Sequence, residues 1–287
     1  MLFITNRKLK EKPRFSRKRK IRFDLNNSQP ETSIYFCEKE SSAGDLYEVG
    51  HQAFFETLRT EDCPQLLLFI HGYNVLPEDA FLQAQELQQL CDDKQPGEVQ
   101  VVPMLWPTDN DLGMIQDYYD DQITADGSAV AFARAFMFFL GWREQRQSLP
   151  PEQQCLKRIN LLAHSMGNRV LRGAIRATSY YFQGDALPLI FRNIFLVAPD
   201  LVNETLEPGR EGEMIPWITR NCGVYYAADD FAMRASKIGN VRHRIASKRL
   251  GHTGPESMNR VPANVYAFNC DGFNNRYDPP LGHGYFL

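Results

Sequence analysis

The clearest indication of the fold lies in residues 158–171, Arg158-Ile-Asn-Leu-Leu-Ala-His-Ser-Met-Gly-Asn-Arg-Val-Leu. This stretch opens with a run of strand length, 159–162, and continues from residue 170 with apolar residues at helical spacing. Between the two lies Ala163-His-Ser-Met-Gly167, in which a small residue stands two positions away from the serine on either side. A tight turn from strand to helix needs small residues there, because a bulky side chain would collide with the strand or the helix.

Ser165 is therefore the candidate nucleophile. In such a turn its hydroxyl projects above the sheet, with the N-terminal N–H groups of the following helix behind it. The stretch departs from the Gly-x-Ser-x-Gly form at Ala163, which differs from glycine by one methyl group. The alternative is a serine that only caps the helix.

The composition is that of an ordinary globular protein, because 43% of the 287 residues are hydrophobic and 23% are charged. No secretory signal is visible, and the longest apolar tract, 129–142, is interrupted by Arg134 and is too short to span a bilayer. The six cysteines are scattered without a C-x-x-C pair, which favours free thiols over disulfides or a zinc site. We expect a cytoplasmic protein without a metal.

Positive charge is concentrated at the start of the chain. Residues 1–22 hold ten Lys or Arg and one acidic residue, although the whole chain has a net charge of −3. Such a segment either contacts an anionic surface or is a solvated extension. We expect residues 1–37 to form a basic segment with a leading hairpin of strands 21–25 and 33–37, and residues 38–287 to form one domain. No nucleic-acid partner is implied.

Strand and helix patterns alternate along the rest of the chain. The expected strands are 66–70, 99–105, 159–162, 189–198, 223–228 and 265–268; the expected helices are 77–91, 128–142 and 231–238, with a polar loop before residue 128. This order predicts an α/β fold with a mostly parallel sheet and helices on both faces. Polar or aromatic residues that end the strands then meet at one edge of the sheet: His71, Trp106, Ser165, Asp200 and Asp230. No dinucleotide-binding or phosphate-binding glycine motif is present, so no cofactor is expected.

The chain resembles the α/β-hydrolase superfamily, and within it a bacterial family of largely uncharacterised α/β hydrolases. The matching motifs are Phe69-Ile-His-Gly-Tyr-Asn-Val, Leu105-Trp-Pro with Tyr118-x-x-Asp, Ala163-His-Ser-Met-Gly-Asn, Val197-Ala-Pro-Asp, Tyr226-Ala-Ala-Asp-Asp-Phe-Ala-Met and Gly282-His-Gly-Tyr-Phe. They cover roughly residues 65–287 and are more specific for the fold than for a substrate. The chain departs from the family at Ala227-Ala228, where a serine-rich strand end is usual.

The resemblance implies the order nucleophile, acid, histidine along the chain. A serine hydroxyl needs a base within reach, and an imidazole oriented by a carboxylate is suited to that role. His283 is the candidate base, and His243 and His252 are its competitors. Asp230 is the preferred acid, with Asp200 and Asp229 as alternatives. His71 and His164 come too early for this order, and we expect them to shape the pocket floor or to hydrogen-bond the backbone.

Two backbone N–H groups must form the oxyanion hole, and we assign them to Tyr73 and Met166. Trp106 and the pair Tyr118 and Tyr119 either line the substrate pocket or belong to the core. Residues 201–221 are irregular and partly apolar, and are either a lid over the site or a surface loop.

Two functions are compatible with these features. The first is a serine hydrolase of the esterase, lipase or thioesterase type that cleaves small-molecule or lipid esters through an acyl-enzyme. The second is a non-catalytic binding or scaffold module that uses the hydrolase fold, with the basic N-terminal segment as a docking arm.

Overall fold

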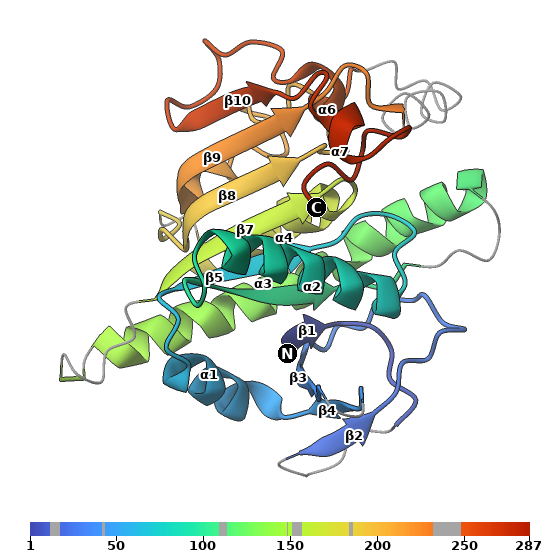
Figure 1. Cartoon of the computed structure of the whole chain (residues 1–287). Helices are drawn as coiled ribbons and strands as arrows, with labels where there is room; N and C mark the ends of the chain where they lie inside the picture. The colour runs from blue at the N-terminus through green and yellow to red at the C-terminus, as the bar shows by residue number, and fades with distance from the viewer. Residues whose placement is uncertain are drawn as a thin grey trace.

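The computed structural model describes residues 1–11, 18–41, 44–108, 114–147, 149–150, 157–183, 186–231 and 248–287, without the side chains of residues 114–116 and 146–147. A single sheet of ten strands runs through the molecule (Figure 1), in the spatial order β10-β9-β8-β7-β5-β6-β1-β3-β4-β2. The strands are β1 (Leu2–Thr5), β2 (Arg19–Ile21), β3 (Tyr35–Lys39), β4 (Leu46–Glu48), β5 (Gln65–Ile70), β6 (Val99–Leu105), β7 (Arg158–His164), β8 (Phe191–Val197), β9 (Thr219–Tyr226) and β10 (Val265–Asn269).

The sheet is mostly parallel. Every neighbouring pair from β10 to β1 is parallel, and β3, β4 and β2 continue the sheet as antiparallel strands. The central strand β5 is apolar from Leu66 to Ile70 and buried throughout that run, as expected for a strand covered on both faces. The predicted α/β architecture is confirmed.

Helices cover both faces of this sheet (Figure 1). The longer ones are α1 (Gly50–Thr60), α2 (Pro77–Lys94), α3 (Met114–Gln147) and α4 (Gly167–Ser179); the short ones are η2 (Tyr180–Phe182), η3 (Pro216–Ile218), α6 (Leu250–Thr253) and α7 (Asn274–Tyr277). Buried side chains of α1, α3 and α4 share one apolar cluster with the sheet. Those of α2 pack into two further clusters that also include β1, β5 and β6.

The helix α3 begins earlier than the sequence pattern indicated. Tyr118 to Asp121, expected in a polar loop, lie in its first turns. The polar residues Asp117 and Asp121 are buried there, and Asp121 accepts a hydrogen bond from the backbone N–H of Asn74. Buried polar residues with hydrogen-bond partners occupy positions where apolar residues would otherwise indicate a helix, so the sequence lacks the helical pattern there.

By length and composition alone, α3 also contains a segment, Asp117–Gln145, that is long and apolar enough to cross a membrane. In this fold, 61% of the most apolar part of this segment is buried. Packing against the sheet and α4 therefore accounts for much of its apolar character.

The N-terminal residues are part of the main sheet, which corrects the division at residue 37. β1 lies between β6 and β3, and Phe3 and Ile4 are fully buried. The expected hairpin is also wrong: β3 pairs with β1 and β4, and β2 pairs with β4. A two-stranded hairpin is only marginally stable in water, whereas a place within a covered sheet buries these strands.

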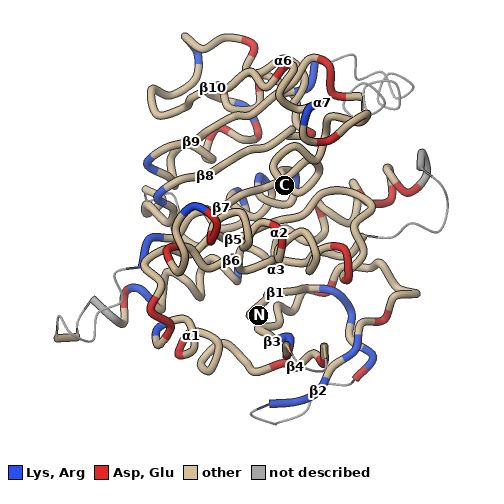
Figure 2. The backbone as a smooth tube through the Cα atoms, in the orientation of Figure 1, with Lys and Arg blue, Asp and Glu red and all other residues tan. Residues whose placement is uncertain are grey.

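Four basic residues of this segment form ion pairs with acidic residues: Lys18, Arg19, Lys20 and Arg22. Figure 2 shows the basic positions of β2 in blue. Arg19 pairs with Glu48, and Lys20 pairs with Asp45. The side chain of Arg7 is buried and donates to the carbonyls of Trp106 and Thr108. Residues 12–17 lie outside the described part of the chain. Four of the ten basic side chains in residues 1–22 are thus paired with acidic ones in the described part of the chain.

Candidate active site

Ser165 lies at the junction of β7 and α4, in a backbone conformation that side chains rarely adopt. Its φ is 50°, a left-handed value that is strained for a residue other than glycine. Its N–H donates to the carbonyl of Val197 at 2.9 Å, and its carbonyl accepts the N–H groups of Asn168 and Asp200 at 3.1 and 3.2 Å. The turn is therefore held from the adjacent strand β8 and from the helix.

Small neighbours make this turn possible, as the sequence pattern predicts. A Cβ atom on Gly167 would lie 2.4 Å from the carbonyl oxygen of His71, so no larger residue fits. A Cβ on Gly72 would lie 3.1 Å from the Cβ of Ser165 and 2.9 Å from Nδ1 of His164. The backbone of the loop after β5 thus runs directly beside the serine.

His71 fixes the conformation of that loop. Its Nε2 accepts the N–H of Trp106 at 3.2 Å, so the proton lies on Nδ1, which donates to the Gly72 carbonyl at 2.9 Å. Burial lowers the pKa of His71 to about 3, which keeps the ring neutral. The Gly72 carbonyl and the Tyr73 N–H belong to the same planar, trans peptide bond. Fixing the direction of the carbonyl therefore also fixes the direction of the N–H.

The second candidate oxyanion donor is the N–H of Met166. Met166 is fully buried and caps the N-terminus of α4. Its N–H donates to no acceptor within the described ranges. A buried N–H without an acceptor is uncommon in folded proteins, and here it adjoins the serine at a helix N-terminus, where negative charge is stabilised.

His283 and Asp230 come together at the same edge of the sheet. Nδ1 of His283 lies 2.7 Å from Oδ2 of Asp230. The Asp230 side chain is fully buried and that of His283 is 17% exposed. Asp230 follows β9, and His283 lies in the C-terminal loop after α7. The fold thus brings together two of the three residues assigned to a triad, over 53 positions of the chain.

The loop of His283 is held against the serine turn by His164. Nε2 of His164 lies 3.0 Å from the carbonyl oxygen of His283, and the two rings are 4.7 Å apart. Burial, and then the charge of His283, lower the pKa of His164 well below its usual value. The neutral ring therefore donates through Nε2. Because His164 directly precedes Ser165, this contact ties the histidine loop to the turn.

Asp278 is a site residue that the sequence reasoning missed. Its Oδ2 accepts the N–H groups of His283 at 2.7 Å and Gly284 at 2.6 Å. One carboxylate oxygen thus fixes the backbone at the candidate base. The Asp-Pro-Pro stretch that precedes Gly282 is the only local sequence signal, and it indicates a turn rather than this contact.

The alternative acids have other partners. Asp200 accepts the hydroxyl of Tyr118 at 2.6 Å and lies 3.3 Å from Nε of Arg249, with both charged side chains buried. Asp229 accepts the amide of Asn275 at 2.6 Å. The burial of the Arg249 side chain is explained by the carboxylate beside it.

The remaining candidates occupy several environments. Trp106 is fully buried, stacks on His71 and donates from Nε1 to the His71 carbonyl, so it supports the loop after β5 from the core. Tyr118 lies edge-on to both Tyr73 and Tyr119. His252 lies in α6. His243 and most of the helix expected at 231–238 lie outside the described residues.

The segment 201–221 is anchored by apolar side chains. Leu201, Leu206, Ile215 and Ile218 are buried in the main core. Its last residues, from Thr219 onward, begin β9 and are not part of an irregular loop. This part of the expectation is wrong, because Thr219 and its neighbours pair with β8.

A family model described as "Alpha/beta hydrolase of unknown function (DUF900)" matches residues 48–287. The chain belongs to this α/β-hydrolase family. No curated protein matches it. Family membership agrees with the mostly parallel sheet and with the strand-turn-helix at Ser165. The family description assigns no substrate.

Proposed function

We propose that this chain is a serine hydrolase that cleaves carboxylic esters or thioesters through an acyl-enzyme, with Ser165 as nucleophile, His283 as base and Asp230 as acid. The observation that carries the proposal is the 2.7 Å contact between His283 and the buried Asp230 carboxylate, tied through His164 to the strained serine turn. A carboxylate on Nδ1 keeps the proton there and leaves Nε2 as the base.

The chemistry follows from this arrangement. Nε2 of His283 takes the hydroxyl proton of Ser165 as Oγ attacks the ester carbonyl. The N–H groups of Tyr73 and Met166 stabilise the negative charge on the carbonyl oxygen. His283 then returns the proton to the leaving alcohol or thiol as its bond to the acyl carbon breaks. A water molecule, activated by the same imidazole, releases the acid and regenerates Ser165.

Ser165 and His283 do not line the charged cavity beside the turn, and we propose that the acyl group of the substrate extends into it, which would favour polar substrates over long-chain lipids. The cavity of about 480 Å³ is lined by twelve residues, of which only Leu201 and Val202 are apolar. Asp200 and Arg169 line it, and Asp200 is bonded to the backbone of Ser165. Charged groups lose hydration against an alkyl chain, so a long acyl group would bind there unfavourably.

The activity is tested with a fluorophosphonate probe and with activated esters. Wild-type protein should be labelled and should turn over p-nitrophenyl acetate. Ser165→Ala should lose labelling and lower turnover on the order of 10⁴-fold or more. An alanine variant that keeps the wild-type rate would contradict the assignment, and an unlabelled, inactive but folded wild-type protein would favour the non-catalytic alternative.

Substrate preference is measured with p-nitrophenyl esters of acetate, butyrate, octanoate and palmitate. We expect kcat/KM to fall from butyrate to palmitate. A steady rise towards octanoate would show that the charged cavity does not receive the acyl group.

A further inference from the structure

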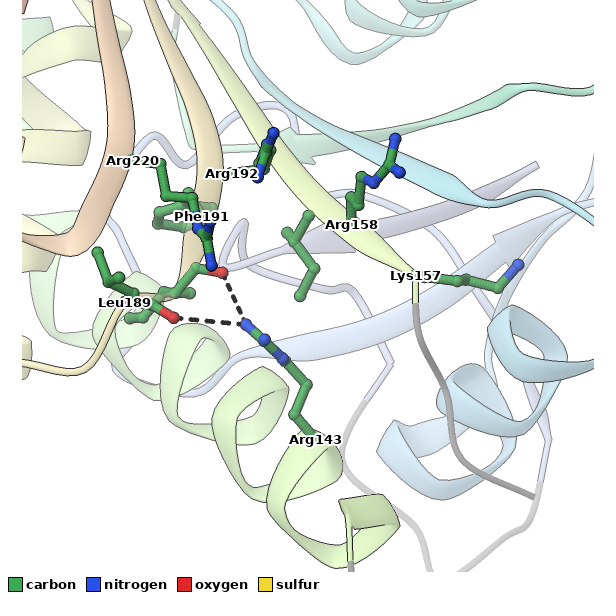
Figure 3. Close-up of a pocket in the computed structure, with 9 residues that line it drawn as sticks. Arg143, Lys157, Arg158, Leu189, Phe191, Arg192 and Arg220 are labelled. Atoms are coloured by element: carbon green, nitrogen blue, oxygen red, sulfur yellow. Dashed lines mark hydrogen bonds between the residues drawn. The ribbon is translucent and has the colours of Figure 1, made fainter. Parts of the chain in front are cut away.

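A second, smaller cavity lies at the opposite end of the strands from Ser165. Figure 3 shows the residues that line it. The cavity has a volume of about 190 Å³ and adjoins the starts of β7, β8 and β9. Arg158, which lines it, begins β7, whereas Ser165 follows the last residue of that strand. Seven residues of strand span roughly 20 Å, so this cavity is separate from the candidate active site.

The lining of this cavity is strongly basic. Five of its nine lining residues carry a positive charge, and none carries a negative one: Arg143, Lys157, Arg158, Arg192 and Arg220. Among the described residues, no salt bridge involves any of these five. The cavity therefore has an excess of positive charge in a protein whose net charge is −3.

Two of these side chains are already committed to backbone carbonyls. Arg143, on α3, donates to the carbonyls of Leu189 and Ile190 at 3.4 and 3.0 Å (Figure 3). Lys157 donates to the carbonyl of Glu61 at 2.6 Å. Burial raises the pKa of the Glu61 carboxyl, and the charge of Lys157 opposes this rise. Glu61 does not line the cavity. Neutral carbonyls hold these side chains in place without cancelling their charge.

Arg192 and Arg220 are direct neighbours on adjacent strands. The register of β8 and β9 pairs Phe191 with Thr219 and Asn193 with Asn221, which places Arg192 opposite Arg220. Like charges in this position destabilise a sheet. Both residues are exposed, so each guanidinium is accessible to a ligand. An anion between them would remove the repulsion.

We propose that this cavity binds a phosphate-bearing anion, with Arg192 and Arg220 as its main ligands. Guanidinium groups donate paired hydrogen bonds to phosphate oxygens, and a phosphate presents several oxygens to more than one arginine. The small volume fits a phosphate group rather than a large ligand. The chemistry is shared by a soluble phosphate compound and by a phospholipid headgroup.

The test uses inorganic pyrophosphate, measured by calorimetry and thermal unfolding at constant ionic strength. Wild-type protein should bind it saturably and gain thermal stability, since a ligand that binds only the folded state stabilises it. The double variant Arg192→Gln/Arg220→Gln should bind at least 10-fold more weakly. Without pyrophosphate it should unfold at the wild-type temperature or above, because the variant removes a like-charge pair.

A matched control is Arg176→Gln, because Arg176 is an exposed arginine of α4 outside this cavity. It should bind pyrophosphate like the wild type. Equal binding by wild type and the double variant, or no saturable binding by the wild type, would overturn the proposal. Ester turnover should stay unchanged in the double variant, so the result does not depend on the proposed hydrolase activity.

The source of the phosphate is distinguished with vesicles. Cosedimentation with phosphatidic acid vesicles, but not with phosphatidylcholine vesicles, that is lost in the double variant would identify a phosphomonoester lipid headgroup. Binding of pyrophosphate without vesicle binding would identify a soluble phosphate compound.

Discussion

Nδ1 of His283 lies 2.7 Å from Oδ2 of Asp230, and no comparable contact joins His283 to Asp200, whose carboxylate is paired with Arg249 and Tyr118. The two carboxylates therefore have different roles. Asp230 is placed to orient an imidazole. Asp200 neutralises a buried arginine beside the serine turn.

Asp230→Asn should lower turnover of an activated ester on the order of 10⁴-fold, because the amide presents the wrong partner to Nδ1. Asp200→Asn should keep turnover within about tenfold but lower the free energy of unfolding by about 3 kcal/mol, because it leaves Arg249 buried without its counter-charge. Steady-state rates and denaturant unfolding of both variants check this. The reverse pattern of rates would place the acid at Asp200.

Asp278→Ala should lower kcat on the order of 10²-fold while the protein stays folded. The variant removes the acceptor of the His283 and Gly284 N–H groups, and small displacements of a catalytic group have effects of this size. The control is Asp93→Ala, on the exposed side of α2. The rate of fluorophosphonate labelling should fall in parallel with kcat. A variant with normal labelling would show that Asp278 does not position the histidine.

Gly72→Ala should lower kcat/KM at least tenfold. The added methyl would lie 2.9 Å from Nδ1 of His164 and 3.1 Å from the Cβ of Ser165, so the loop must move away from Ser165. Gly141→Ala is the matched control, because a Cβ at Gly141 meets no atom within 4 Å and alanine favours its helix by about 1 kcal/mol. Full activity in Gly72→Ala would contradict the position assigned to the oxyanion loop.

Acidification should destabilise the fold through His71 and His164. The unfolded histidines take up protons near pH 6.5, whereas burial lowers the pKa of His71 to about 3 and that of His164 well below 6.5. Below pH 6.5 the unfolded state therefore binds more protons. The free energy of unfolding should fall with decreasing pH, by up to about 1.4 kcal/mol per pH unit for each histidine, and no such loss should occur above pH 6.5.

Nitrogen-detected NMR of the folded protein checks the cause directly. The ring nitrogens of His71 and His164 should show no protonation between pH 7.5 and 5. Titration of either ring near pH 6.5 would show that burial does not hold it neutral.

The order of the strands from β5 to β10 and the serine turn were predictable from the sequence alone. Ala163 and Gly167 mark the turn because only small residues fit there, and the apolar run 66–70 marks a buried strand because burial on both faces leaves no polar position. These are local constraints, and local residue types are enough to reveal them. The order of Ser165, Asp230 and His283 along the chain was likewise visible once the motifs were recognised.

Contacts between residues that are distant in the sequence became visible in the folded structure. The contact of His283 with Asp230, the support of its loop by Asp278 and His164, and the burial of Arg249 beside Asp200 all join separate elements. The place of β1 inside the sheet and the early start of α3 also depend on contacts between separate elements. In the sequence, a charged residue that becomes buried looks like any charged surface residue, and a basic terminal strand looks like a surface segment. The partners of both lie in other parts of the chain, and the packing of the whole sheet brings them together.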